Sequence, residues 1–344
     1  MDLESVDVAM LHQDPHPAHR GFAEAVGADL VDYHARSLGS LSGSVVADVV
    51  NGLTYPDYDV YLVEGSRPLY AALVRRFTRG GTVIYLCADH GLYALGEGDF
   101  EGDSLLKSLV GRFGTPLVRA VGRRGIDGVV AVSEFAAEFT RSVVGQGTPI
   151  EIAHPFVQAE TYDALGQVNP DLDSNVAVTV ARPWHYKGVD MLVDAWPHVR
   201  EAIPDAELHV VGGGHPESYG DTPGVTVRGY VEDLADAFEP ASLFVQPSRM
   251  DTFPVSTLEA MRAGVPALVT TGAGTRSEAR EIDASLVVDP TPEALAAGVV
   301  DYFERDTADR ERFASVARER GVRFDAASRK RAFRDAFRHV LAEL

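Results

Sequence analysis

Short apolar runs alternate along this chain with longer segments in which apolar residues recur every three or four positions. The short runs predict β-strands, and the periodic segments predict α-helices. Alternation of this kind is typical of βαβ units on parallel sheets, so we expect an α/β fold. The expected strands are 6–11, 28–33, 59–64, 82–87 and 128–132 in the first half, and 176–181, 206–211, 225–228, 242–246, 266–270 and 285–288 in the second. The expected helices are 68–79, 104–124, 134–144, 188–202, 256–263, 291–304, 307–322 and 326–344.

Each half of the chain contains enough strands for an open sheet of its own, and 344 residues exceed the usual size of a single core. Turn-forming residues without periodicity fill 155–175, where we expect a linker. We therefore predict a Rossmann-like N-terminal domain at 1–160 and a Rossmann-like C-terminal domain at 170–325. The helix at 326–344 can cross back to the first domain. Ligands of parallel sheets bind outside the carboxyl ends of the strands, so the cleft between the domains is the expected site.

Composition narrows the class of protein. The net charge of −20 argues against a nucleic-acid partner, because phosphates would be repelled. Only three of the 31 basic residues are lysines, and acid excess with arginine in place of lysine resembles haloarchaeal proteins; an acidic protein from a GC-rich genome is the alternative. The single cysteine, Cys87, allows no internal disulfide and indicates a reducing compartment. The N-terminus lacks the pattern of a signal peptide, and no apolar run is long enough to span a membrane.

Candidate chemistry follows three strands of the second half. Arg182 and Lys187 lie after the strand at 176–181, where an arginine fork and a compact ammonium can face one diphosphate. Two solvated loop cations are the alternative, although keeping a lysine in so lysine-poor a chain favours the diphosphate. Glycines at 212–214 follow the next strand and either let backbone approach a ligand or form a plain turn.

Two acids, Asp251 and Glu259, follow the strand at 242–246, the first in a loop and the second in a helix. Carboxylates suit the hydroxyl groups of sugars and ribose, which donate paired hydrogen bonds. The helix N-terminus near Ser256 favours an anion such as phosphate. A solvated loop acid and a surface helix acid are the alternative for each residue alone.

Four segments in order resemble family 4 of the retaining glycosyltransferases, which has the GT-B fold of two Rossmann-like domains facing across a cleft. They are VVAVSEFAAEF (129–139), VARPWHYKGVDMLVDAW (180–196), LHVVGGG (208–214) and PSRMDTFPVSTLEAMRAGVPALV (247–269). The resemblance covers roughly 125–325. It implies that Arg182 and Lys187 neutralise a nucleotide diphosphate, that Glu259 binds ribose and that Asp251 contacts the donor sugar. The remaining expected donor-binding residues are Gly213, Gly214, Phe253, Val255 and Ser256.

The chain departs from the family pattern at several positions. Ala181 replaces a glycine, Asp251 replaces a glutamate, and Thr252 and Pro254 replace two more glycines, so the sugar contacts can differ. Pro254 has no backbone N–H to donate. The glycine pair usual after the first strand is replaced by HQDPHPAHRGF at 12–22.

Histidines are candidates in the first half. We expect His12 and His16 on the acceptor side; a metal site that includes His19 and an ordinary loop are the alternatives. His90 follows the strand at 82–87, and the resemblance implies that it contacts the transferred sugar; a core or capping histidine is the alternative. No metal cofactor is expected, because two side-chain cations can do the work of a metal.

Two stretches of this acidic chain, 65–88 and 104–126, contain basic residues and no acid. In the second stretch, leucine, valine and phenylalanine interleave with the cations, a pattern that suits a surface in contact with anionic lipid. A helix packed on its sheet with basic residues facing the cleft is the alternative. The cations of the second stretch are Lys107, Arg112, Arg119, Arg123 and Arg124, of which we expect Arg119 and Arg123 on the acceptor side.

We therefore predict a hexosyltransferase-type glycosyltransferase that moves a sugar from a nucleotide diphosphate to a glycan or lipid-linked acceptor. The resemblance implies retention of the anomeric configuration by front-face attack, with the leaving phosphate taking the acceptor proton. We expect a cytoplasmic enzyme. A peripheral position on the inner face of the cell membrane is compatible with this expectation. A nucleotide-sugar 2-epimerase of the same architecture and a non-catalytic nucleotide-sugar-binding protein are the alternatives.

Overall fold

The computed structural model describes residues 3–13, 15–33, 45–89, 120 and 122–344. The chain forms two compact units. The N-terminal unit contains Met1–Pro155 together with Ala327–Leu344, and the C-terminal unit contains Phe156–Ala326. The chain therefore passes between the units twice.

The N-terminal unit contains a six-stranded parallel sheet in the order β2-β1-β3-β4-β5-β6. Its central strands are continuous apolar runs because helices cover both faces, as is usual for parallel sheets. The strands are β1 (Val8–His12), β2 (Asp29–Asp32), β3 (Val60–Glu64), β4 (Thr82–Cys87), β5 (Gly128–Ala131) and β6 (Ile150–Ile152). The helices of this unit are α1 (Pro17–Val26), α2 (Val45–Thr54), α3 (Ser66–Arg79), α6 (Glu134–Val143) and α14 (Ala326–Ala342), and a short 3-10 helix, η1, covers Leu3–Ser5.

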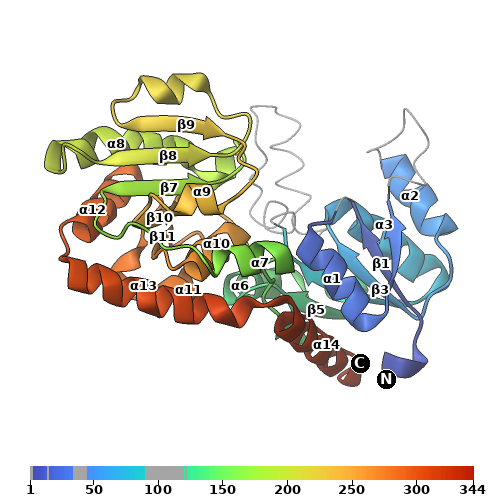
Figure 1. Cartoon of the computed structure of the whole chain (residues 1–344). Coiled ribbons are helices and arrows are strands. Elements are labelled where there is room, and N and C mark those ends of the chain that lie inside the picture. The colour runs from blue at the N-terminus through green and yellow to red at the C-terminus, as the bar shows by residue number, and fades with distance from the viewer. Residues whose placement is uncertain (1–2, 14, 34–44, 90–119, 121) are drawn as a thin grey trace. The chain divides into compact units, whose positions relative to one another are not determined.

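The last helix, α14, packs in the N-terminal unit, where it lies beside α1 (Figure 1). The ring of Phe333 stacks on that of Phe22 in α1, with 4.2 Å between the ring centroids. Lys330 Nζ donates to Glu24 Oε2 over 2.7 Å at the edge of this contact. The predicted return of the C-terminal helix to the first domain is confirmed.

The C-terminal unit contains a second six-stranded parallel sheet, in the order β12-β11-β10-β7-β8-β9. The strands are β7 (Val176–Val180), β8 (Glu207–Val211), β9 (Val225–Gly229), β10 (Leu243–Gln246), β11 (Ala267–Thr270) and β12 (Val287–Val288). The α-helices are α7 (Ala159–Leu165), α8 (Val189–Ala202), α9 (Ala235–Phe238), α10 (Val255–Ala263), α11 (Arg276–Arg280), α12 (Pro292–Phe303) and α13 (Thr307–Gly321). Short 3-10 helices are η4 (His185–Lys187), η5 (Glu217–Asp221), η6 (Ala284–Leu286) and η7 (Val322–Phe324).

The predicted α/β fold of two Rossmann-like units is confirmed, and every expected strand is present with its ends shifted by at most two residues. The edge strand β6 was not expected, because it has only three residues, none of them buried. The segment 155–175, where we expected a linker, contains α7, whose Leu165 is fully buried. The Arg262 guanidinium lies 4.3 Å from the Tyr162 ring centroid, so α7 packs on α10 as part of the C-terminal unit. Most of the helix expected at 104–124 lies outside the described residues.

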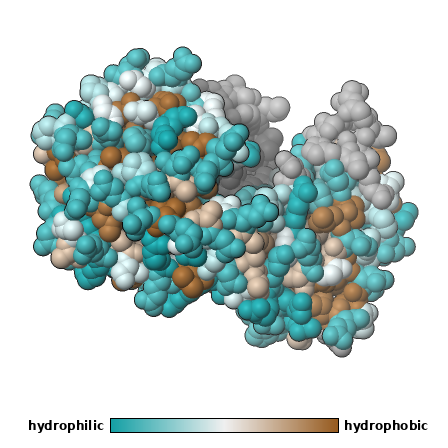
Figure 2. Space-filling model, viewed as in Figure 1, coloured by the Kyte–Doolittle hydropathy of each residue, from teal (hydrophilic) through white to brown (hydrophobic). Residues whose placement is uncertain are grey.

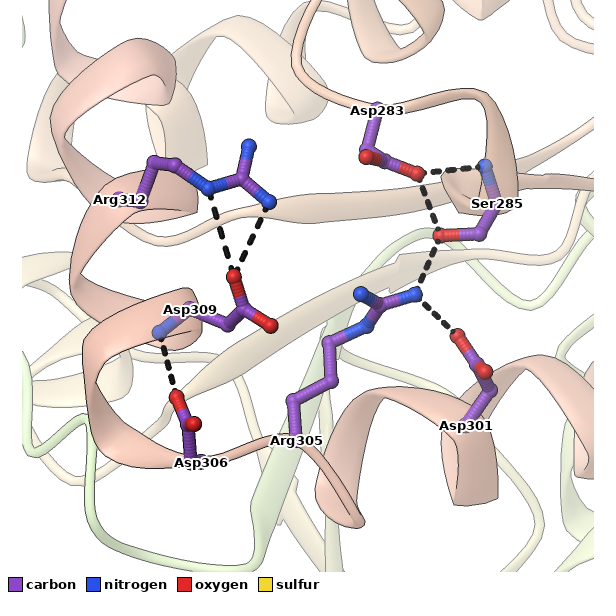
Figure 3. Close-up of polar contacts among 7 residues, drawn as sticks. All are labelled: Asp283, Ser285, Asp301, Arg305, Asp306, Asp309 and Arg312. Carbon is purple, nitrogen blue, oxygen red and sulfur yellow. Dashed lines mark hydrogen bonds and ion pairs between the residues drawn. The ribbon is translucent and has the colours of Figure 1, made fainter.

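Acids and arginines meet on the surface of the C-terminal unit. Hydrophilic residues predominate on the face drawn in Figure 2. Arg305 donates to Asp301 Oδ2 over 2.6 Å and to Ser285 Oγ over 3.0 Å, while Asp283 accepts from the Ser285 hydroxyl and N–H (Figure 3). The N–H and hydroxyl of Ser285 outweigh burial and hold the pKa of Asp283 below its usual value. In the same view Asp306 caps α13, and Asp309 pairs with Arg312. Such exposed ion pairs contribute at most about 1 kcal/mol each.

No helix in the described ranges, which omit 34–44 and 90–119 among others, is long and apolar enough to cross a membrane.

Candidate functional site

The candidate site lies where the C-terminal sheet changes direction. Strands β7 and β10 are neighbours, but β8 lies on the far side of β7 and β11 lies on the far side of β10. The loops that leave β7 and β10 therefore diverge, and ligands of open parallel sheets bind at this kind of position. The segments 181–188 and 247–254 follow these two strands. The structure thus brings the loops of Arg182, Lys187 and Asp251 to one edge of one sheet.

Lys187 and Asp251 form an ion pair across these two loops. Lys187 Nζ lies 2.6 Å from Asp251 Oδ2, and the side chains are only 17% and 9% exposed. Gly188, which follows the lysine, has a φ of 69°, and a Cβ there would collide with the Pro247 carbonyl oxygen. The loops can approach this closely only because residue 188 is a glycine. The sequence predicted that Lys187 and Asp251 contact different parts of a ligand. In the structure the two side chains instead pair with each other.

Arg249, in the loop after β10, and Asp190, in the first turn of α8, make a second link beside the first, and sequence reasoning missed it. Arg249 binds both carboxylate oxygens of Asp190 at 2.7 Å and also donates to the His185 carbonyl at 2.8 Å. Burial alone would raise the pKa of Asp190, but the hydrogen bonds and charge of Arg249 outweigh it and lower that pKa. This bidentate pair holds the loop of Lys187 in place.

Arg182 is exposed and is positioned by aromatic rings. Its guanidinium lies 5.0 Å from the centroid of the Trp184 ring, and that ring stacks on Tyr186 at 5.5 Å. Arg182 makes no ion pair with any described residue, whereas the charge of Lys187 is already opposed by Asp251. Arg182 is therefore the cation of this edge that is most available to an incoming anion.

Helix α10 contributes polar and acidic groups beside these loops. Its N-cap, Pro254, makes no side-chain capping bond. Ser256 Oγ donates to Gln246 Oε1 over 3.0 Å, which ties the first turn of the helix to the end of β10. The side chain of Phe253 is buried near Phe324, so a ligand could contact only the backbone of that residue. Val255, also predicted from sequence, lies partly exposed at the first helical position.

Glu259 is an acid without a partner. Its side chain is only partly exposed, and it makes no hydrogen bond or ion pair within the described part of the chain. Burial raises the pKa of Glu259 to about 7. A buried carboxylate lacks the hydrogen-bond donors that water supplies at the surface. Hydroxyl groups of a ligand would supply such donors and so stabilise the charged form of Glu259.

The glycine segment after β8 is fastened to the loop after β7. Gly212 has a φ of 135°, and a Cβ there would collide with the Ala181 carbonyl oxygen. The same oxygen lies 2.8 Å from Nε2 of His215. The predicted residues Gly213 and Gly214 therefore lie beside the residue that precedes Arg182.

The predicted histidines of the N-terminal unit make different polar contacts, although the rings of His16 and His19 lie 5.6 Å apart. His12 lies at the end of β1 and is nearly buried, and Nδ1 of His16 accepts from the Ala18 N–H to cap α1. His19 Nδ1 lies 2.5 Å from Oε1 of Glu64, a partner that the sequence did not suggest. Among the described residues no three metal-ligating side chains form a cluster. Arg123 and Arg124 are exposed, while His90, Lys107, Arg112 and Arg119 lie outside the described residues.

Comparison with known proteins identifies the C-terminal unit. Residues 174–305 match the sequence model of the family described as glycosyl transferases group 1. This segment belongs to the glycosyl transferases group 1. The match covers β7 to α12 and therefore includes Arg182, Lys187, Asp251 and Glu259.

Several curated proteins match parts of the chain. Mannosylfructose-phosphate synthase of Agrobacterium fabrum is 32% identical over 120 residues, which are 30% of this chain and 26% of that protein. Phosphatidyl-myo-inositol mannosyltransferase of Mycobacterium leprae is 27% identical over 210 residues, which are 58% and 56% of the two chains. The chain thus spans about a quarter to a little over half of the length of these relatives.

Solved structures match nearly the whole chain. Sucrose-phosphate synthase from Thermosynechococcus elongatus has a TM-score of 0.72 at 18% identity, covering 98% of this chain and 100% of that one. Anabaena HepE, solved in complex with UDP and glucose, has a TM-score of 0.69 at 17% identity with the same coverage. At such low identity these likenesses show the fold, which is the predicted GT-B class.

Proposed function

We propose that this group 1 glycosyl transferase moves a hexose from a nucleotide-diphosphate donor to an acceptor with retention of the anomeric configuration. The observation that carries the proposal is the meeting of unlike charges at the β7–β10 edge. Arg182, which has no acidic partner among the described residues, and Lys187 lie in the loop after β7, and Glu259, which has no donor among those residues, lies in the helix α10 that follows the loop after β10. A nucleoside diphosphate matches both kinds of group. Its anionic phosphates can pair with the cations, and its ribose hydroxyl groups can donate hydrogen bonds to the carboxylate.

In the proposed reaction, the sugar–phosphate bond breaks as Arg182 and Lys187 compensate the charge that develops on the leaving diphosphate. Asp251 holds the Lys187 ammonium in the loop before the donor arrives. When the donor binds, the Lys187 ammonium also donates a hydrogen bond to the phosphate. Asp251 then accepts a hydrogen bond from a hydroxyl group of the sugar. Glu259 accepts hydrogen bonds from the ribose. The acceptor attacks from the face that the phosphate leaves, and the departing phosphate oxygen takes the acceptor proton.

The relatives support a hexose donor. Two of them are named as a mannosylfructose-phosphate synthase and a phosphatidyl-myo-inositol mannosyltransferase, and HepE was solved with UDP-glucose. We assign the donor to the C-terminal unit, which contains the charged edge, and the acceptor to the N-terminal unit. The name of the second relative, together with the basic stretch that ends at Arg123 and Arg124, supports a lipid-linked acceptor and a peripheral position at an anionic membrane.

The test is a transfer assay with UDP-glucose and GDP-mannose as donors and free sugars, a sugar phosphate and phosphatidyl-myo-inositol as acceptors. Release of the nucleoside diphosphate is measured, and NMR gives the anomeric configuration of the product. We expect acceptor-dependent release and a retained configuration. Lys187→Met should abolish transfer, and the matched Lys330→Met should not, because Lys330 lies on α14 of the N-terminal unit, where it pairs with Glu24 of α1. An inverted product, or turnover of the donor that no acceptor changes, would contradict the proposal.

A further inference from the structure

The backbone of Trp184 joins the two cations of the loop after β7. Its N–H donates to the Arg182 carbonyl over 2.8 Å, and its carbonyl accepts from the Lys187 N–H over 2.9 Å. The Tyr186 carbonyl in turn accepts from the Arg249 N–H over 2.9 Å, which fastens this loop to the loop after β10. The backbone that carries both cations is therefore held in place by hydrogen bonds within the protein.

The side chains of this loop form a continuous series of cation, ring, ring and cation. The Arg182 guanidinium lies 5.0 Å from the centroid of the Trp184 ring, and Lys187 Nζ lies 5.4 Å from the centroid of the Tyr186 ring. A ring face attracts a cation over about 6 Å, so both distances are short enough for this attraction. The two rings stack on each other, with 5.5 Å between their centroids and 29° between their planes. Each ring of the stack thus holds one cation.

The two rings limit the spacing of the two charges. Arg182 and Lys187 repel each other when no anion is bound, and the attraction of each cation to its own ring opposes this repulsion. The rings themselves are already in contact and cannot approach much further. The stack therefore sets a separation between the guanidinium and the ammonium before a donor arrives.

Trp184 holds Arg182 without competing strongly with a phosphate. The tryptophan is 46% exposed, and a contact between a cation and an aromatic ring is weak at an exposed site. An acidic side chain in its place would form a charge-assisted pair with Arg182, which an incoming phosphate would have to displace. The ring therefore positions the guanidinium and leaves its charge available to a ligand.

We propose that Trp184 is a positioning residue for Arg182, and that its stack with Tyr186 spaces Arg182 and Lys187 for two linked phosphate groups rather than one. This inference rests on the proposed function and adds a selectivity to it. A diphosphate can contact both cations at once, whereas a monophosphate can be bound by one of them. Lys187 is held by Asp251 as well as by Tyr186, so the contact that depends most on the stack is that of Arg182.

The test is calorimetry with UDP, GDP, UMP and GMP on two variants of Trp184. Trp184→Leu keeps an apolar side chain but removes the ring face, and Trp184→Phe keeps a ring. The matched control is Phe77→Leu, because Phe77 is an aromatic residue that is 57% exposed on α3 of the N-terminal unit. Trp184→Leu is also measured in the Arg182→Met background, and melting temperatures verify that every variant folds.

We expect Trp184→Leu to weaken the binding of the preferred nucleoside diphosphate roughly fivefold, the effect of one contact between a cation and a ring, and to leave monophosphate binding within about twofold. Trp184→Phe should stay within about twofold of the wild type for every nucleotide, because a phenylalanine ring also attracts a cation. Phe77→Leu should bind as the wild type does. In the Arg182→Met background, Trp184→Leu should cause no further loss, because Trp184 acts through Arg182.

Equal losses for diphosphate and monophosphate, wild-type affinity in Trp184→Leu, or a further loss in the Arg182→Met background would overturn the role of Trp184 and leave the proposed function standing. If the wild-type protein bound neither UDP nor GDP, both proposals would fail together.

Discussion

We predict that Glu259 makes the binding of the donor depend on pH. Burial raises the pKa of its carboxyl to about 7, and the proposed contact with ribose needs the ionised form. About a tenth of such a carboxyl is ionised near pH 6 and about nine tenths near pH 8. Because the apparent affinity scales with the fraction in the competent state, the affinity for a nucleotide sugar should rise about tenfold over this interval.

Calorimetry with UDP-glucose or GDP-mannose measures this dependence cleanly. The diphosphate of a nucleotide sugar is esterified at both ends and so lacks the phosphate group that titrates near pH 6 in a free nucleotide. In Glu259→Gln the pH dependence should disappear, and the affinity near pH 8 should fall to about the level of the wild type near pH 6. A wild-type affinity that is flat across this range, or a Gln variant that keeps the dependence, would refute the reasoning.

The same pKa predicts an effect on stability. Since the folded pKa lies above the ordinary value of 4.5, the unfolded chain ionises first as pH rises, and stability falls until about pH 7. The loss is about 3 kcal/mol at most, because each pKa unit corresponds to about 1.4 kcal/mol and the carboxyl keeps some exposure. Without ligand, Glu259→Gln should therefore raise the melting temperature near pH 8 and leave it unchanged near pH 4. A variant less stable than the wild type at both values would contradict this account.

Four further predictions concern charge. Lys187→Arg should slow transfer about 10- to 100-fold, because the planar fork does not fit the contact with Asp251, and wild-type kinetics in steady-state assays would exclude the role of the ammonium. Asp251→Asn should bind nucleoside diphosphate at least as tightly as the wild type in calorimetry, because it frees the charge of Lys187, and should transfer sugar more slowly; weaker binding would show that the acid serves the nucleotide. Between about 0.1 M and 1 M salt the melting temperature should rise, because screening shortens the repulsion among the acids, and a constant value would refute this. Wild-type protein should co-sediment with anionic liposomes in molar salt more than Arg123→Glu/Arg124→Glu does; equal sedimentation would exclude these arginines from the membrane surface.

The sequence predicted the fold well because buried parallel strands are continuous apolar runs, such as Val60–Glu64. It also indicated that the motifs of the candidate site follow the ends of strands, which the structure shows for the segments after β7 and β10. It could not predict the pairs of Lys187 with Asp251 and of Arg249 with Asp190. Both pairs join the loop after β10 to the segment after β7, either its loop or the first turn of α8, and they exist only because the sheet order makes these strands neighbours. For the same reason, Glu64 went unnoticed as the partner of His19, since β3 lies beside β1 in the N-terminal sheet.

The central claim is that the β7–β10 edge of the C-terminal unit binds a nucleotide-diphosphate sugar through Arg182. Calorimetric titration of the whole chain with UDP-glucose and GDP-mannose tests it most directly, in the wild type, in Arg182→Met and in Arg323→Met, which alters an exposed arginine elsewhere in the same unit. The account predicts that at least one donor binds with one site per chain, that Arg182→Met weakens it at least tenfold, and that Arg323→Met leaves it unchanged. Absence of binding by either donor, or equal affinities in the two variants, would contradict the claim.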